Sequence, residues 1–103
     1  MNDTLAAPGT VLVSTWGYDQ TNVDFFEVTR ATRHTLWLRP IAVKRGETTT
    51  DLSGYVLPQP GKYIGAELRR RPIAGAADLR VAIDSVAHAR PWDGAPVHET
   101  RWA

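Results

Sequence analysis

The chain has 103 residues, 43% of them hydrophobic and 22% charged, a balance that fits one soluble globular domain and argues against a disordered chain. No apolar run approaches the ~18 residues that a membrane span needs, and residues 1–9 lack the basic and apolar regions of a secretory signal. The absence of cysteine excludes disulfides, thiolate metal ligands and cysteine nucleophiles, so we expect a cytoplasmic protein.

The first half of the chain predicts a β-hairpin. Residues 1–8 are expected to form a flexible N-terminal tail. Apolar and polar residues then alternate with the two-residue period of a β-strand. We expect an opening strand at 11–14, followed by a central hairpin whose strands cover 26–30 and 36–43 around a turn at Arg33-His34.

The second half is divided by prolines and glycines into shorter segments. Residues 46–54 are polar and predict a loop or a frayed hairpin end. Residues 91–94 have the composition of a turn. Further short strands are expected at 55–57, which Pro58 and Pro60 would stop, and at 68–71, 79–83 and 97–102. A helical stripe also fits part of 79–87; we favour the strand at 79–83, and the alternative near 84–88 is a short helical turn.

Short strands separated by turn residues predict one mainly β domain over residues 1–103. The expected architecture is a small antiparallel barrel or strongly bent sheet, SH3-like or of a related Greek-key type, with at most one short helix. Trp37, Trp92 and Trp102 are expected in the core or on a sheet face.

Residues 14–26 combine large rings with short polar side chains. Rings favour burial, whereas amides and carboxylates need hydrogen-bond partners, so the segment predicts an ordered turn in which Gly17 permits a positive φ. One interpretation is a connector whose rings complete one end of the core. The other is a recognition surface with aromatic anchors and polar directional groups. Its residues would be Trp16, Tyr18, Asp19, Gln20 and Asn22.

The stretch from Gly9 to Val28 resembles a set of small, mostly uncharacterised proteins encoded by bacteriophages and prophages, through its pattern Ser-x-Trp-Gly-Tyr-Asp-Gln-Thr-Asn-x-Asp-Phe. Residues 89–96, which contain Trp-Asp-Gly, are similar to the C-terminal part of those proteins. The resemblance implies an origin in a phage or another mobile element. It brings no established activity, and it does not extend to residues 46–77.

The net charge of +1 conceals an uneven distribution of charge. Residues 1–29 contain acidic but no basic side chains, residues 30–45 contain basic but no acidic ones, and an arginine triplet follows at 69–71. On a strand, alternate members of the triplet face one way. The arginines predict either a phosphate-binding face or a solvated face that protects a sheet edge from aggregation. The candidate basic face consists of Arg30, Arg39, Arg69 and Arg71.

No arrangement of residues predicts catalysis. The three histidines lack metal-ligand spacing, and the chain has no P-loop, no dinucleotide-binding glycine motif and no nucleophilic serine motif. Asp19 and Asp24 form the one carboxylate pair considered for acid–base work or Mg²⁺, although aspartate is also a common turn former. We therefore expect a non-enzymatic protein without a metal or cofactor.

Two functions remain. The first is an accessory protein that binds a host or phage protein, which the small size and the tryptophan- and arginine-rich composition favour. The second is a small nucleic-acid-binding module that combines a basic face with exposed aromatic rings. The near-neutral net charge places protein binding slightly ahead. A homodimer through an exposed edge strand is compatible with either function.

Overall fold

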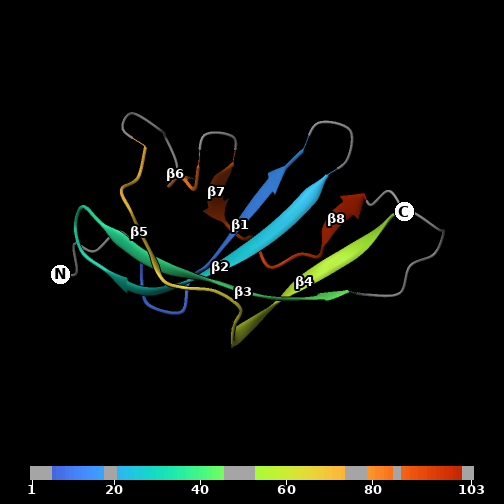
Figure 1. The fold of residues 1–103 in the computed structure, drawn as a ribbon, viewed down its shortest axis with the longest axis horizontal. Helices are drawn as coiled ribbons and strands as arrows, with labels where there is room; N and C mark the ends of the chain where they lie inside the picture. The colour runs from blue at the N-terminus through green and yellow to red at the C-terminus, as the bar shows by residue number, and fades with distance from the viewer. Residues whose placement is uncertain (1–5, 18–20, 46–52, 74–78, 85–86, 101–103) are drawn as a thin grey trace.

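The computed structural model describes residues 6–17, 21–45, 53–73, 79–84 and 87–100, and it contains no helix among them. These residues form one sheet of eight strands, all paired antiparallel (Figure 1). The strands are β1 (Val11–Trp16), β2 (Asn22–Ala31), β3 (Leu36–Arg45), β4 (Ser53–Tyr63), β5 (Leu68–Arg70), β6 (Val81–Ala82), β7 (His88–Pro91) and β8 (Val97–Thr100). The predicted mainly β fold and its central β2–β3 hairpin are confirmed.

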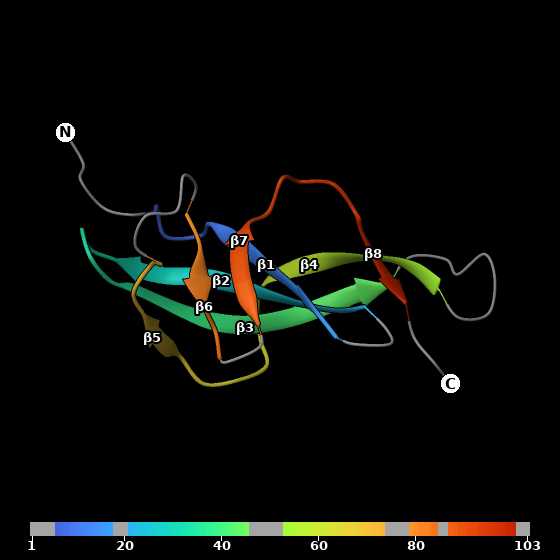
Figure 2. The ribbon, with the colours of Figure 1, turned by 90° about the horizontal axis from the view of Figure 1, so that it is seen from above.

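The strand order is β6-β7-β1-β2-β3-β4-β8, and β5 pairs with β3 outside this path. Strands β2 and β3 run along the length of the molecule, with β5, β6 and β7 toward the end that carries the β2–β3 turn and β8 toward the other end (Figures 1 and 2). Among the described residues no pairing joins β8 to β6 or β7. The architecture seen here is therefore a bent sheet, and an SH3-like topology stays a prediction.

Two hydrophobic cores lie on opposite faces of this sheet. Successive side chains of a strand point to opposite faces, so the adjacent rings of Phe25 and Phe26 enter different cores. The first core contains Leu12, Phe26, Val28, Leu36, Leu38, Val81 and Ala89. The second core contains Val13, Val23, Phe25, Ile41 and Val56. Strands β1, β2 and β3 thus change the face they bury along their length.

The predicted end of a strand at Pro58 is wrong, because β4 continues through both prolines to Tyr63. The pairing of β4 with β3 is irregular at this point. Pro58 lies opposite Val43 and Tyr63 opposite Ile41, so residues 59–62 stand against Ala42 alone. Proline lacks a backbone N–H and is tolerated where the ladder is interrupted in this way.

The predicted helical turn at 84–88 is also wrong for the residues that the structure describes. The N–H groups of Ile83 and Asp84 donate to the carbonyl of Ala87, at 2.8 and 3.3 Å. A helix would need the donor to follow the acceptor in sequence, so these bonds instead close the β6–β7 hairpin. Residues 85–86 lie outside the described part. The strand interpretation of 79–83 is confirmed over Val81–Ala82.

Of the predicted N-terminal tail, residues 1–5 lie outside the described part of the chain. Ala6 packs, partly buried, against the first core. The backbone N–H of Thr10 donates to the carbonyl of Ala7 at 3.1 Å, and that of Gly9 donates to the carbonyl of Val28 at 2.8 Å. The chain is therefore attached to β2 before β1 begins.

The turn at residues 92–96 connects β7 to β8, which lie in opposite halves of the strand order. The Trp92 ring packs against the second core and meets the Phe25 ring edge-on, with centroids 5.9 Å apart. Its indole N–H donates to the carbonyl of Ala95 at 2.7 Å. Asp93 accepts the N–H of Ala95 at 2.9 Å, and Gly94 takes a φ of 92° that few other residues tolerate. Trp92 is thus partly buried against the second core, in agreement with the expectation that it lies in the core or on a sheet face.

Replacing Trp92 with alanine is expected to lower the free energy of unfolding by about 2–3 kcal/mol, because Phe25 and the second core lose a half-buried ring. Chemical denaturation followed by circular dichroism measures the change. Trp16→Ala is the matched control, since that ring is 39% exposed and its loss is expected to cost less than about 1 kcal/mol. Equal stability of the Trp92→Ala protein and the wild type would contradict this role.

Candidate functional site

Three side chains form a row across strands β2, β3 and β5. Arg30 lies opposite Trp37 in the β2–β3 pair, and Trp37 lies opposite Arg69 in the β3–β5 pair. Directly opposed residues of neighbouring strands project from the same face of a sheet. Arg39 follows Trp37 on that face, and Tyr63 packs beneath its guanidinium. We call this surface the arginine face; it consists of Arg30, Trp37, Arg39, Tyr63 and Arg69.

A β-bulge places Arg30 on this face. The register of β2 against β3 shifts between Val28 and Arg30, so Thr29 is an extra residue in β2. Without it, the alternation would direct residue 30 to the side where Val28 enters the first core. The Thr29 hydroxyl lies 2.6 Å from the carboxylate of Glu67 and 3.2 Å from the carbonyl of Trp37. These contacts hold the bulge in place.

Two arginines of this face lie over aromatic rings. The guanidinium carbon of Arg30 is 4.5 Å from the centre of the Trp37 ring, and that of Arg39 is 4.3 Å from the centre of the Tyr63 ring. Each cation–π contact contributes about 0.5–1 kcal/mol at an exposed site. The contacts also orient the two guanidinium groups; the Arg30 side chain is exposed, and the Arg39 side chain is half-buried.

A close backbone approach fixes Arg39 further. Its Nε donates to the carbonyl of Gly65 at 3.1 Å. A Cβ on Gly65 would come within 2.6 Å of the Pro40 ring, so only glycine fits against this part of β3 without a shift. The segment after β4 is thereby held against the arginine face.

Two carboxylates of the described residues, Glu27 and Glu67, lie near the arginine face, and each contacts hydrogen-bond donors. Glu27 accepts the backbone N–H of Gly61 at 2.7 Å and the hydroxyl of Tyr63 at 3.0 Å. Glu67 lies against the Thr29 hydroxyl. The hydrogen bond to Glu27 raises the pKa of Tyr63, with smaller contributions in the same direction from burial and from the charge of Glu27, while Arg39 acts in the opposite direction.

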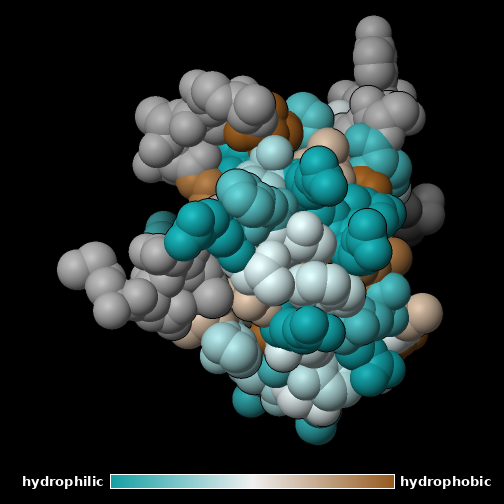
Figure 3. Space-filling view, turned by 90° about the vertical axis from the view of Figure 1, so that its left-hand side faces the viewer, coloured by the Kyte–Doolittle hydropathy of each residue, from teal (hydrophilic) through white to brown (hydrophobic). Residues whose placement is uncertain are grey.

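The three arginines of the triplet at 69–71 differ in their exposure to solvent. Arg69 and Arg71 are exposed, whereas Arg70 is half-buried, as expected for alternation along a strand. The guanidinium of Arg70 donates from Nε and Nη2 to the carbonyl of Ile83, at 3.2 Å each, and so connects β5 to the β6–β7 hairpin. Arg71 lines a hollow beside Arg33 and His34, at the β2–β3 turn. This end of the molecule has a largely hydrophilic surface (Figure 3).

The second predicted surface, around residues 16–22, is described in part. Trp16 is 39% exposed, and its indole N–H donates to Asp24 at 2.7 Å. Asn22 lies opposite Trp16 in the β1–β2 pair. The other predicted members, Tyr18, Asp19 and Gln20, lie outside the described residues, and so does one half of the Asp19–Asp24 carboxylate pair. The described partner of Asp24 is an indole.

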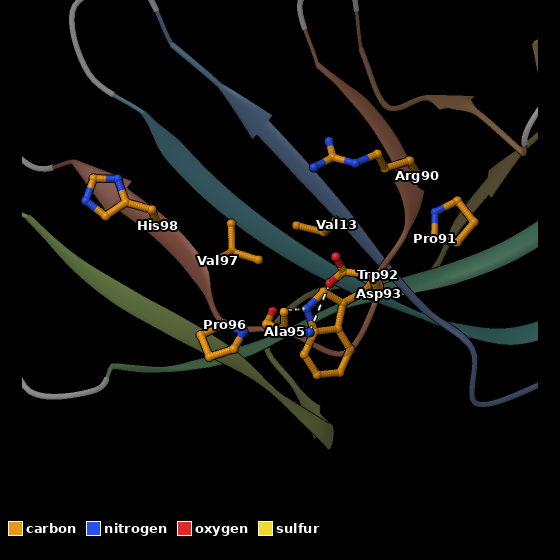
Figure 4. A pocket seen from close by; sticks show the side chains of 9 residues that line it. All are labelled: Val13, Arg90, Pro91, Trp92, Asp93, Ala95, Pro96, Val97 and His98. Atoms are coloured by element: carbon orange, nitrogen blue, oxygen red, sulfur yellow. Dashed lines mark hydrogen bonds between the residues drawn. The ribbon is translucent and has the colours of Figure 1, made fainter.

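A smaller pocket of about 260 Å³ opens between β7 and β8 (Figure 4). Val13 and Val97 form part of its apolar lining. The guanidinium of Arg90 and the imidazole of His98 lie on opposite sides of the pocket. The Asp93 carboxylate accepts the backbone N–H of Ala95 within the turn. The charged groups of the pocket do not converge on one point, so the arginine face is the better candidate site.

Comparisons with protein-family models, with curated proteins and with solved structures gave no match to this chain. The resemblance to phage-encoded proteins therefore stays a prediction. Within the described ranges, no three histidine, aspartate or glutamate side chains are grouped closely enough to hold a metal ion. The described part of the chain also contains no helix long and apolar enough to cross a membrane.

Sequence reasoning identified the arginines of the site but missed Glu27, Tyr63 and Gly65. The last two belong to residues 46–77, where no motif was found. Only the irregular pairing of β4 with β3 brings Tyr63 opposite Ile41 and beside Arg39. Apolar alternation gives no signal for such a displacement.

Replacing Glu27 with glutamine is expected to lower the pKa of Tyr63 toward the ordinary tyrosine value of 10.0, because the phenol loses a charged acceptor. Ultraviolet titration of tyrosinate absorbance measures this, and Tyr63→Phe identifies the residue responsible. The raised pKa stabilises the fold below the pKa of the unfolded chain, and this contribution is lost as pH rises through the folded value. An unchanged Tyr63 titration in the Glu27→Gln protein would contradict the assignment.

Proposed function

We propose that this protein binds single-stranded nucleic acid on the arginine face. The observation that carries the proposal is the row of Arg30, Trp37 and Arg69 across three neighbouring strands, with Arg39 stacked on Tyr63 beside it. Proteins that bind single strands combine positive charge along the backbone with flat groups on which bases stack. This face supplies both within one surface.

The chemistry of arginine suits both tasks. A guanidinium can donate two parallel hydrogen bonds to a phosphate, and its planar surface can stack on a base. Ring contacts already orient the guanidinium groups of Arg30 and Arg39, so less conformational freedom is lost on binding. Glu27 and Glu67 lower the net charge of the face, but each has a donor from the protein itself.

The shape of the site favours single strands over duplex. Base edges in a duplex are read by an element that enters a groove. The arginine face extends over three neighbouring strands, whereas the major groove admits a single helix or a two-stranded β-ribbon. Unpaired bases, in contrast, can lie flat on a sheet surface that carries stacking groups.

Substitutions should separate charge from stacking. Arg69→Ala is expected to weaken binding of an unphosphorylated single-stranded DNA and to reduce the salt slope of the affinity by about 0.7, the value for one phosphate contact. Arg30→Lys keeps the charge but removes the planar group, so we expect an unchanged salt slope and an affinity loss of about fivefold. Fluorescence anisotropy over a series of salt concentrations measures both quantities.

Arg90→Ala serves as the matched control, because Arg90 is exposed on β7 and does not belong to the arginine face. We expect Arg90→Ala to weaken binding less than Arg69→Ala does. Absence of binding to single-stranded DNA and RNA at low salt would refute the proposed function. Equal losses for Arg90→Ala and Arg69→Ala would refute the assigned surface.

The end of the β1–β2 hairpin supports a second candidate function, the binding of a host or phage protein. Trp16 presents a partly exposed ring whose indole N–H is held by Asp24 at 2.7 Å. An ordered, exposed tryptophan is typical of interface anchors. Recovery of one defined protein partner from a host lysate, and its loss with Trp16→Ala but not with Arg69→Ala, would favour this function over nucleic-acid binding.

A further inference from the structure

A hollow at the β2–β3 turn lies next to the arginine face. It is an open depression of about 540 Å³, lined by Arg33, His34, Arg71, Pro72 and Ile73. Its polar lining consists of basic side chain types, and Pro72 and Ile73 supply an apolar wall. The pairing of Arg70 with Leu36 brings β5 alongside the first residues of β3, so Arg71 reaches the turn that carries Arg33 and His34.

The turn side of this hollow is built from backbone hydrogen bonds. The N–H of Thr32 donates to the carbonyl of Thr35 at 2.9 Å. The Thr32 hydroxyl accepts the N–H of Thr35 at 3.2 Å and that of His34 at 3.4 Å. These bonds fix the backbone of the turn, which carries the exposed residues Arg33 and His34 at the edge of the hollow.

The opposite side of the hollow is fixed as well. Pro72 forms an isolated β-bridge with Val81, which is fully buried in the first core. The N–H of Ile73 donates to the carbonyl of Arg80 at 2.7 Å. Because both sides are anchored, the basic side chains are brought together before any ligand arrives, and binding needs little ordering of the backbone.

We infer that this hollow binds the terminal phosphate of the single strand whose bases lie on the arginine face. The inference rests on the proposed function and extends it from single strands in general to strands with a phosphorylated end. A terminal phosphate monoester carries more negative charge than an internal diester and presents three acceptor oxygens. Two guanidinium groups and an imidazole can donate to such a group together, whereas a diester in the middle of a strand presents only two non-bridging oxygens.

The position of the hollow supports a strand end as its occupant. Arg69 in the cross-strand row and Arg71 at the hollow are two residues apart on the same chain, so the two sites are continuous. The hollow lies at the end of the molecule that carries the β2–β3 turn, and the residues that the structure describes form no strand beyond it. A nucleic-acid strand that crosses the row to Arg69 and then follows the chain to Arg71 reaches the hollow with its terminus.

The test compares one single-stranded DNA sequence with a 5′-phosphate, with a 3′-phosphate and with hydroxyls at both ends, by competition against a labelled unphosphorylated strand. One of the phosphorylated strands is expected to bind about tenfold more tightly than the hydroxyl strand, the effect of one charge-assisted hydrogen bond. Arg33→Ala and Arg71→Ala should each remove most of this preference. Arg90→Ala, at the other pocket, should retain it.

Equal affinity for all three strands would overturn the inference and leave the proposed function intact. A mononucleotide that binds as tightly as the phosphorylated strand would also overturn it, because the ligand would then be a free nucleotide. A preference that survives both Arg33→Ala and Arg71→Ala would place the phosphate elsewhere. If no strand binds at all, the proposed function fails together with the inference.

Discussion

The structure depends on one constraint: adjacent side chains of a strand must point to opposite faces of the sheet. Phe25 and Phe26 satisfy this constraint by entering separate cores, and Leu12 and Val13 do the same in β1. The sheet therefore buries one of its faces in the first core and its opposite face in the second core, toward different ends of the strands. Where β2 and β3 pack in the first core, their opposite face carries Arg30, Trp37 and Arg39 of the arginine face.

The bulge at Thr29 is what converts this fold into a candidate binding surface. The extra residue shifts the alternation of side chains in β2, so that each residue after the bulge points to the face opposite to the one it would otherwise take. Arg30 then joins Trp37, while Ala31 packs against the first core. The placement of the cations thus follows from backbone geometry as much as from composition.

Much of the fold could be predicted from the sequence, because apolar alternation over 11–14, 26–30 and 36–43 reports directly on buried strand faces. The prediction failed at Pro58, where an irregular ladder accommodates two prolines. At Asp84 and Ala87, a hydrogen bond that closes the β6–β7 hairpin takes the place of a helical turn. The pairing of β4 with β3 and of β7 with β1 joins segments that are distant in sequence, and local pattern does not contain such contacts.

The arginines of the candidate site could be predicted from the sequence, whereas the residues that contact them could not. The arginine triplet and its alternation indicated that Arg69 and Arg71 share a side, and both are exposed in the structure. The convergence of Arg30 and Arg69 on Trp37 required the bulge and the pairing of β5 with β3, neither of which leaves a sequence signature. Tyr63 and Glu27 meet over a long separation for the same reason.

The strand order has a consequence for how the chain acquires its structure during synthesis. Strands β1 to β4 are neighbours in both sequence and space, so they can assemble hairpin by hairpin as they emerge. Strands β7 and β8 come last and are joined by a short turn, yet they add to opposite halves of the sheet. Ala89 from β7 enters one core, and Val97 from β8 packs on the other. A nascent polypeptide that stops before these strands leaves both apolar interiors uncovered at once.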